Sequence, residues 1–295
     1  MKSGFIAIIG RANAGKSTLI NTILDRKIAI ATHKAQTTRN AIAGIYNDDD
    51  SQMIFIDTPG IHDAKTTLGS YMNREALSQA NGADVVYFIC DGYKGLQKED
   101  EEILDKLFSY ELPVFLLINK IDTLKDDVLI SRLTYAASRY DFAEIVPISA
   151  LEKKNIDELL KTTKGYLSDS VRYYPEDMIT NMSEEFNVSE IIREKIILST
   201  YEEIPHLTAV EIEELKKTDN KVFIEATIIC NKDTHKGIII GKNGSMLKKI
   251  NIAASKELKA YFEKKVVLSL YVRVEEDWLN KEKRLFELGY FLDKE

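Results

Sequence analysis

A glycine-rich stretch near the N-terminus carries the most specific chemistry in the sequence. It reads GRANAGKS and lies between an apolar run typical of a strand and a pattern typical of a helix. Glycines let backbone amides close around a phosphate, and the N-terminus of the following helix favours the same negative charge. Lys16 can neutralise β- and γ-phosphate oxygens, and the Ser17 hydroxyl can bind Mg²⁺. The predicted nucleotide-binding residues of this loop are Gly10, Arg11, Ala12, Asn13, Ala14, Gly15, Lys16, Ser17 and Thr18.

A second motif, DTPG, follows the apolar run MIFI. A DxxG sequence at this place puts its aspartate, Asp57, beside the metal and the amide of Gly60 beside the γ-phosphate. Between the two motifs lies AQTTRN, where Thr38 is expected to complete the Mg²⁺ coordination and Thr37 is the alternative. The second motif adds Asp57, Thr58, Pro59, Gly60 and Ile61 to the predicted nucleotide site. The predicted metal ligands are Ser17, Thr38 and Asp57, and the predicted catalytic residues are Lys16, Thr38 and Gly60.

Two further motifs indicate which base the nucleotide carries. NKID ends the apolar run VFLLI, and its Asp122 carboxylate can accept hydrogen bonds from guanine N1–H and the C2 amino group. Adenine offers an acceptor at N1 and no amino group at C2, so the same carboxylate rejects it. An amide of the Ser149–Ala150 pair, after IVPI, can donate to the guanine O6. The predicted base-binding residues are Asn119, Lys120, Ile121, Asp122, Ser149 and Ala150.

These four motifs, each after a predicted strand, resemble those of the small GTPase family over residues 4 to about 168. The resemblance implies a switch that binds GTP or GDP and hydrolyses GTP with Mg²⁺. One departure is informative: Ile61 stands where Ras-type enzymes have a glutamine that orients water. Slow unassisted hydrolysis is therefore expected, with the water held by backbone groups, a partner or a cation. Asn13 is similar to the asparagine of GTPases that recruit K⁺, so potassium activation is one open alternative.

The elements that position these motifs alternate between strand and helix patterns. The predicted strands are FIAIIG, IAGIY, MIFID, VVYFICD, VFLLINK and IVPIS, with helices from Lys16, around 71–80, near 98–108 and at 156–167. Only the short turn NDDDSQ separates IAGIY from MIFID, which predicts one antiparallel hairpin in an otherwise parallel sheet. The expected fold is α/β, with a mixed, mostly parallel sheet and helices on both faces.

The length of 295 residues favours two compact units. We predict a GTPase domain over residues 1–170, a linker over 171–183 that contains Pro175, and a second α+β domain over 184–295. The apolar runs are far shorter than the ~18 residues of a membrane span, and the N-terminus lacks a signal-peptide pattern. A cytoplasmic monomer is expected.

The second domain contains one basic stretch in a chain whose net charge is −7. Residues 231–265 hold nine lysines and three acidic residues. Within the stretch, IIIGKNGSMLKKI combines a strand-like apolar run, a GxxG loop and an amphipathic helix, which resembles the KH pattern. KH domains clamp about four nucleotides of single-stranded RNA with this loop. The predicted RNA-binding residues are Lys236, Gly241, Lys242, Asn243, Gly244, Lys248 and Lys249.

The order of the whole chain resembles the Era family of ribosome-associated GTPases. GRANAGKS, AQTTRN, DTPG and NKID are followed by EIIREKIILSTYEEIPHLTAVEIEEL and the GKNG loop. The resemblance implies that the second domain binds single-stranded ribosomal RNA near the 3′ end of the small-subunit rRNA and that the cycle assists maturation of the small ribosomal subunit. It also implies peripheral contact with the inner face of the membrane, although no amphipathic anchor is evident.

Two other functions fit part of this pattern. A regulatory GTPase could bind a protein or membrane surface through its second domain, but the intact GKNG loop and the local positive charge favour RNA. A metabolic P-loop kinase would share GRANAGKS, but NKID favours a GTPase.

Overall fold

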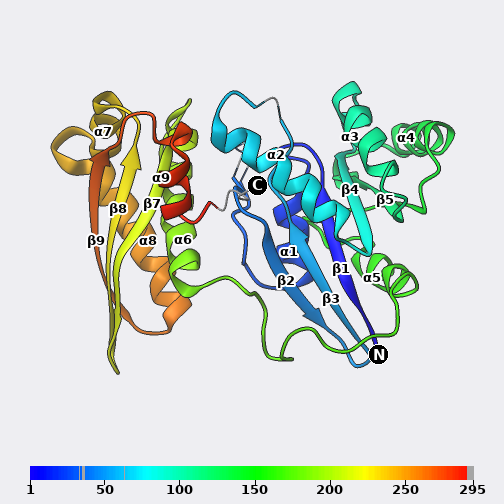
Figure 1. Ribbon diagram of the computed structural model, residues 1–295, viewed down its shortest axis with the longest axis horizontal. Helices are drawn as coiled ribbons and strands as arrows, with labels where there is room; N and C mark the ends of the chain where they lie inside the picture. Colours follow the sequence, from blue (N-terminus) through cyan, green and yellow to red (C-terminus); the bar gives the residue numbers. More distant parts are fainter. Residues whose placement is uncertain (33, 35–36, 63, 291–295) are drawn as a thin grey trace. The chain divides into compact units, whose positions relative to one another are not determined.

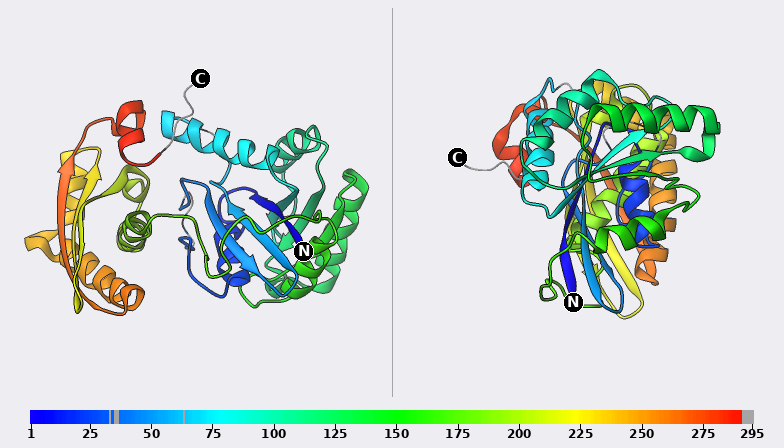
Figure 2. Two further views of the ribbon diagram at one scale, coloured as in Figure 1. Left: turned by 60° about the horizontal axis from the view of Figure 1, so that its bottom comes forward. Right: turned by 90° about the vertical axis from the view of Figure 1, so that its right-hand side faces the viewer.

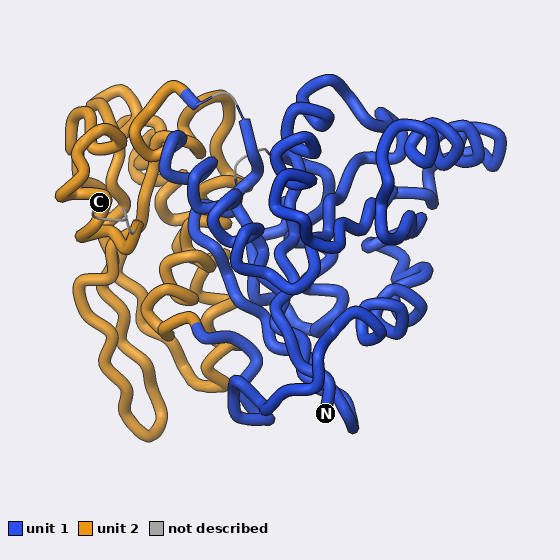
Figure 3. Tube along the Cα trace, turned by 45° about the vertical axis from the view of Figure 1, so that its right-hand side comes forward, with its two compact units in different colours: residues 1–64, 69–181 blue, residues 65–68, 182–295 orange. Residues whose placement is uncertain are grey.

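The computed structural model describes residues 1–32, 34, 37–62 and 64–290. The chain forms two compact units, Met1–Ala64 with Gly69–Asn181 and Lys65–Leu68 with Met182–Glu295 (Figure 3). Among the described residues, no helix has both the length and the apolar character needed to cross a bilayer.

Unit 1 is built on a six-stranded sheet in the order β2-β3-β1-β4-β5-β6 (Figure 1). The β2–β3 pair is antiparallel and every other pairing is parallel, which confirms the predicted hairpin and mixed sheet. The strands are β1 (Lys2–Ile9), β2 (Ile42–Asn47), β3 (Ser51–Asp57), β4 (Val85–Asp91), β5 (Val114–Asn119) and β6 (Glu144–Pro147). The helices are α1 (Lys16–Ile23), α2 (Thr67–Asn81), α3 (Lys98–Phe108), α4 (Asp126–Arg139) and α5 (Ile156–Lys164), with a short η1 (Ile121–Thr123).

Helices cover both faces of this sheet. Residues of α2, α3 and α4 share one core cluster with β1, β4 and β5. On the opposite face, Thr163 of α5 contacts the buried Tyr87 hydroxyl of β4, and α1 packs against Gly44 of β2. The α/β architecture expected from alternating strand and helix patterns is therefore confirmed.

Helix α4 was not predicted from the sequence. It is mostly exposed, and Ala136 is its one buried residue. Ile130 and Tyr135 lie outside its core face and are 63% and 47% exposed. Apolar side chains on the solvent side obscure the 3.6-residue periodicity by which a surface helix is recognised.

The segment after α5 lies along unit 1. The buried Gln52 side chain accepts hydrogen bonds from the Tyr173 and Tyr174 amides at 2.8 and 3.0 Å and donates to the Tyr174 carbonyl at 2.9 Å. Farther along, the Ile45 amide of β2 donates to the Ile179 carbonyl at 2.8 Å. Much of the predicted linker is thus fastened to β2 and β3.

Unit 2 has a three-stranded sheet in the order β7-β8-β9. β7 is antiparallel to β8, and β9 is parallel to β8. The strands are β7 (Thr208–Lys217), β8 (Lys221–Cys230) and β9 (Lys265–Val274). The helices are α6 (Glu184–Ser199), α7 (Asp233–Ile240), α8 (Ser245–Phe262) and α9 (Glu282–Glu287), with short 3₁₀ turns η2 (Ile204–Leu207), η3 (Lys242–Gly244) and η4 (Trp278–Asn280).

One expectation for unit 2 was wrong. The apolar run before GKNG is not a strand but the end of α7, in which Ile239 is buried against the core. A short apolar run cannot be assigned by periodicity alone, and β-branched residues favour the strand interpretation. At the C-terminal end of unit 2, η4 and α9 are separate, because Lys281 has an extended backbone with φ −96° and ψ 98°.

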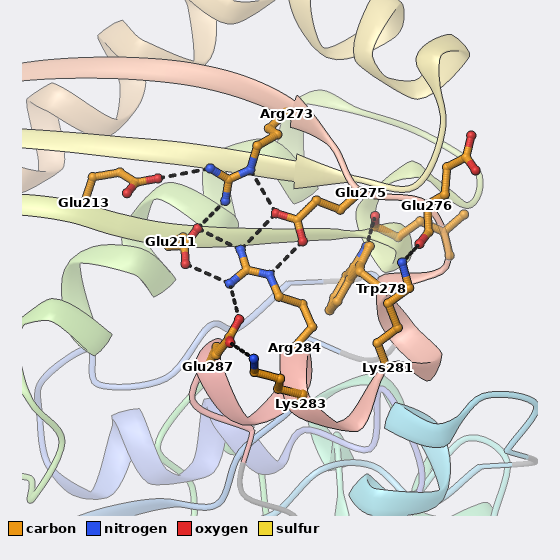
Figure 4. Close-up of polar contacts among 11 residues, drawn as sticks. Glu211, Glu213, Arg273, Glu275, Glu276, Trp278, Lys281, Lys283, Arg284 and Glu287 are labelled. Carbon is orange, nitrogen blue, oxygen red and sulfur yellow. Dashed lines mark hydrogen bonds and ion pairs between the residues drawn. The ribbon is translucent and has the colours of Figure 1, made fainter.

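Helices α6, α7 and α8 cover one face of the sheet, whereas α9 is fastened to the other (Figures 2 and 4). Strand residues point alternately to opposite faces, so Glu211 and Arg273 lie opposite the core residues Val210 and Val272. Arg284 of α9 donates to Glu211 and Glu275 at 2.7–2.9 Å, and Arg273 contacts the same two carboxylates. Hydrogen bonds from Arg284 lower the pKa of Glu211, as expected for a carboxylate in a charged network.

Candidate functional site

The sheet of unit 1 brings the motifs of the sequence to one rim. In the parallel register, Ile8 pairs with Asp57, Asp91 with Asn119, and Ile118 with Pro147. Since these pairs lie at the carboxyl ends of their strands, the loops that follow β1, β3, β5 and β6 emerge together. A rim of this kind is where open α/β sheets bind ligands.

The loop after β1 turns sharply because two glycines have positive φ. Gly10 has φ 155°, and a Cβ there would lie 2.3 Å from the Ile89 carbonyl oxygen. Gly15 has φ 105°, and a Cβ would lie 2.2 Å from the Asn119 side-chain nitrogen. None of the described side chains caps the N-terminus of α1, which begins at Lys16, so its first amides are available to an anion.

The Lys16 ammonium lies inside this loop. Its Nζ donates to the Gly10 and Arg11 carbonyls at 2.8 and 3.0 Å, and the residue is 6% exposed. Burial lowers the pKa of Lys16 to about 8, against the opposing effect of the Asp57 charge. A partly desolvated cation interacts strongly with phosphate oxygens in a low-dielectric site.

The three predicted metal ligands meet although they are distant in sequence. The Ser17 hydroxyl donates to Asp57 Oδ2 at 2.7 Å and lies 2.9 Å from the Thr38 hydroxyl, which is 3.2 Å from the same carboxylate oxygen. Burial raises the pKa of Asp57, although Lys16 and the two hydroxyls oppose the shift. Asp57 Oδ1 is buried with no partner among the described residues. Hard oxygen donors and an unsatisfied carboxylate oxygen fit Mg²⁺.

The DTPG loop packs tightly against the glycine-rich loop. A Cβ on Gly60 would lie 3.1 Å from the Ala12 nitrogen and 3.3 Å from Lys16 Nζ. The buried Thr58 hydroxyl donates to the Ile8 carbonyl at 2.8 Å, and Pro59 continues the turn toward Gly60. Ile61 forms a backbone bridge with Arg11. The Gly60 amide is thereby held close to the phosphate loop.

The two motifs predicted to bind the base are also joined. Asp122 accepts a hydrogen bond from the Ser149 hydroxyl at 2.5 Å, which leaves its other carboxylate oxygen for a ligand. The buried Asn119 side chain links the loops, donating to the Ala14 carbonyl at 2.8 Å and accepting from the Ala150 amide at 3.0 Å. Ile121, at the start of η1, donates its amide to the Ile148 carbonyl at 3.2 Å.

Lys120 and Arg11 make different contacts. Lys120 Nζ donates to the Asn13 carbonyl at 2.8 Å and to Asp91 at 2.6 Å, so its stem crosses the loop beside the base site. The Arg11 side chain points to Glu99 of α3, 3.2 Å away, and not into the phosphate cradle.

The cleft beside the loop has a wall that the sequence motifs did not reveal. Part of this wall comes from the segment before AQTTRN, which has no chemistry-bearing signature beyond a short apolar run. Of AQTTRN itself, Ala35 and Gln36 lie outside the described residues. The lining residues are Ala12, Asn13, Gly15, Lys16, Ser17, Thr18, Ile30, Ala31, Thr32, Thr37, Thr38 and Gly60.

A second glycine loop precedes a helix in unit 2. Gly241 has φ 73°, Asn243 φ 51° and Gly244 φ 76°, so the GKNG loop turns through three left-handed positions. No atom lies within 4 Å of a Cβ built on Gly244, and Lys242 and Asn243 are exposed. None of the described side chains caps the N-terminus of α8. This open loop exposes backbone amides and one lysine, which are groups suited to an anionic ligand.

The remaining predicted RNA-binding lysines lie on the two helices that flank the loop. Lys236 is half-buried on α7, and Lys248 and Lys249 are exposed in the first turns of α8. Arranged in this way, the three lysines and the loop share one end of unit 2.

Comparison with known proteins identifies both units. A family model described as "50S ribosome-binding GTPase" matches residues 5–120, and one described as "KH domain" matches residues 203–279. Solved structures of Era resemble the whole chain: one in complex with MgGDPNP and nucleotides 1506–1542 of 16S ribosomal RNA, and an Aquifex aeolicus variant bound to GDP·AlF4⁻. Each has a TM-score of 0.96 at 39% identity and covers 99% of this chain and 100% of its own.

A curated relative, the GTPase Era of Clostridium kluyveri, is 46% identical over 291 residues, which is 98% of this chain and 99% of the relative. The chain therefore belongs to the Era family of GTPases.

Proposed function

We propose that this GTPase is a switch whose nucleotide state sets its affinity for single-stranded ribosomal RNA of the small subunit. The observation that carries the proposal is the presence of two glycine-loop anion sites in one chain. One lies beside the Ser17–Thr38–Asp57 cluster, and the other is the exposed GKNG loop. A similar Era structure contains nucleotides 1506–1542 of 16S rRNA, which supports this class of RNA as the partner. Assistance in small-subunit maturation is the role that such binding would serve.

The residues of unit 1 take distinct roles in GTP hydrolysis. Ser17, Thr38 and Asp57 would hold Mg²⁺, which neutralises charge on the phosphate oxygens. Lys16 binds the β- and γ-phosphate oxygens, and the Gly60 amide donates to the γ-phosphate. Asp122 selects guanine, and Asn119 holds the base loops together.

A monovalent cation could supply charge that Ile61 cannot. Asn13 has φ 64° in the phosphate loop and is one of the residues that line the cleft. We expect faster single-turnover hydrolysis in K⁺ than in Na⁺. Asn13→Gly, which keeps the left-handed backbone without strain, should remove the difference. Equal wild-type rates in the two salts would exclude the cation.

The fastened segment suggests how the two sites communicate. Thr38 precedes β2 by a few residues, and β2 bonds to the Ile179 carbonyl shortly before the chain enters unit 2. Ordering of Thr38 by GTP can therefore act on the connection between the units. Because residues 173–180 are tied to β2 and β3, we place any reorientation after Thr180 and not at Pro175.

The test is the RNA affinity of the intact protein with a non-hydrolysable GTP analogue and with GDP. Thermodynamic linkage makes the coupling reciprocal: if GTP increases the affinity for RNA by some factor, RNA increases the affinity for GTP by the same factor. Typical couplings correspond to factors of about 5 to 150. Equal RNA affinity in both nucleotide states would exclude the proposed switch, although the assignments of the two binding sites could still hold.

We infer a cytoplasmic location, because the proposed RNA partner belongs to the ribosome. Peripheral contact with the inner face of the membrane follows from the family resemblance alone. Flotation with anionic vesicles, in the presence and absence of RNA, tests it.

A further inference from the structure

Helix α8 presents lysines along one exposed face. At 3.6 residues per turn, Lys248, Ile252, Lys256 and Lys259 fall within one stripe, and Lys249 lies at its edge. All five residues, here named the α8 stripe, are exposed, and Ile252 is 60% exposed. The stripe begins beside the GKNG loop and extends about 16 Å along the helix from Lys248 to Lys259.

The charge of the stripe is not balanced within unit 2. None of its four lysines forms an ion pair with a described residue. The one acidic residue of α8, Glu257, contacts Lys195 of α6, which also binds Glu194 at 2.5 Å. By contrast, Lys217 pairs with Glu184 at 2.6 Å. The helix therefore turns its carboxylate to a neighbouring helix and its lysines to solvent.

An ordinary solvated helix face has a different pattern. Glutamate and lysine commonly alternate at spacings of three or four residues, where they attract each other, whereas like charges at these spacings repel. Lys256 and Lys259 are such a repelling pair, in a protein with a net charge of −7. These lysines repel one another and have no ion-pair partner among the described residues, a pattern that indicates a binding surface for an external anion.

We propose that the α8 stripe continues the phosphate path that starts at the GKNG loop. Lys256 and Lys259 would hold backbone phosphates of RNA outside the nucleotides clamped by the loop. This inference rests on the proposed RNA-binding function and extends it, because a KH loop clamps only about four nucleotides. The charged groups of the stripe are lysines, which would hold phosphates as point charges, so we expect its contribution to depend little on RNA sequence.

Lipid is the less suitable anionic partner. A helix that lies on a membrane inserts a broad apolar face, whereas Ile252 is the one apolar residue in this stripe. Continuity with the GKNG loop also places the stripe where a bound RNA strand leaves the clamp.

The experiment compares two double variants of the full-length protein. Lys256→Gln with Lys259→Gln removes two charges from the stripe. Lys216→Gln with Lys221→Gln removes two exposed charges from the β7–β8 hairpin and is the matched control. Each is titrated with an RNA of nucleotides 1506–1542 and with an oligonucleotide of about six nucleotides that fills little more than the clamp.

The stripe variant should lose about five- to tenfold in affinity for the long RNA at low salt. Its slope of log affinity against log salt should fall by about 1.4, or ~0.7 for each phosphate contact. Affinity for the short RNA should match wild type, and the control should bind both RNAs normally.

Four outcomes would overturn the inference. They are unchanged binding of the long RNA, an equal loss for the short RNA, an equal loss in the control, and loss of anionic-vesicle binding with long-RNA binding retained. If wild type binds neither RNA, the proposed function itself fails, which is distinguishable from a defect of the stripe alone.

Discussion

The two glycine loops of this protein are both suited to binding anions, but one is enclosed by protein and the other is exposed to solvent. Each precedes a helix whose N-terminus none of the described side chains caps, and each uses left-handed residues to expose amides. The loop of unit 1 encloses Lys16, which is 6% exposed, whereas the loop of unit 2 leaves Lys242 in solvent. An enclosed cation acts at low dielectric on one defined group, whereas an exposed one is screened and serves a repeating chain.

This difference explains which chemistry each loop supports. A buried lysine beside an oxygen cluster can stabilise charge that develops during phosphoryl transfer. An exposed loop can let a long polymer enter and leave, because Lys242 and Asn243 are open to solvent.

Replacing the buried cation should have the largest effect. Lys16→Ala should lower the rate of GTP hydrolysis by at least ~10³-fold and weaken nucleotide binding, because an enclosed charge on the β/γ oxygens is lost. Single-turnover kinetics measure the loss. Lys106→Ala, at an exposed position of α3, should behave as wild type. A Lys16 variant with normal turnover would show that the loop has been assigned the wrong role.

Reversing the charge at the exposed loop should weaken RNA binding without changing GTP hydrolysis. Lys242→Asp with Asn243→Asp should weaken RNA binding by about 100-fold or more, because two carboxylates would face the phosphates. Aspartate tolerates the left-handed conformation of residue 243, so the loop should keep its shape. Basal GTP hydrolysis should not change. A fall in hydrolysis equal to the fall in RNA affinity would mean that the two loops are not separate sites.

Salt concentration should affect ligand binding at the two loops differently, without any mutation. About four phosphate contacts give a slope near −2.8, so affinity for a short RNA should fall roughly 50-fold between 50 and 200 mM salt. GTP affinity should change far less, because an enclosed site is weakly screened. Calorimetry on one protein sample gives both values. Parallel salt curves would contradict the contrast between enclosed and exposed sites.

The base site lies between these extremes, since Asp122 is half-buried. Asp122→Asn should weaken GTP binding by about 5- to 150-fold, the equivalent of 1–3 kcal/mol, and favour xanthine nucleotides, whose C2 oxygen suits an amide donor. Ser149→Ala removes the 2.5 Å bond to the carboxylate and the 3.1 Å bond that the hydroxyl accepts from the Glu152 amide, keeps Asp122 itself, and should cost less. Calorimetry with GTP and XTP measures both affinities. If Asp122→Asn bound GTP as tightly as wild type, Asp122 would not be the residue that selects guanine.

The motifs and the strands of unit 1 could be predicted because their information is local. In GRANAGKS and NKID the chemistry-bearing residues are neighbours, and an apolar run of strand length before each motif fixes where its loop emerges. Helix α8 was likewise predicted from the amphipathic pattern that follows the GKNG loop. Helix α4 and the end of α7 were missed because their apolar residues did not follow one face.

By itself, then, the sequence determined the chemical identity of both loops, the preference for guanine and the order of the elements. Only the tertiary structure decided that Ser17, Thr38 and Asp57 meet within 3.2 Å, because strand register sets the distances between remote residues. It also decided that the buried Gln52 fastens the segment after α5 and that Glu257 turns to Lys195 while Lys256 faces solvent. Side-chain direction and burial depend on packing between elements, and no local pattern encodes that packing.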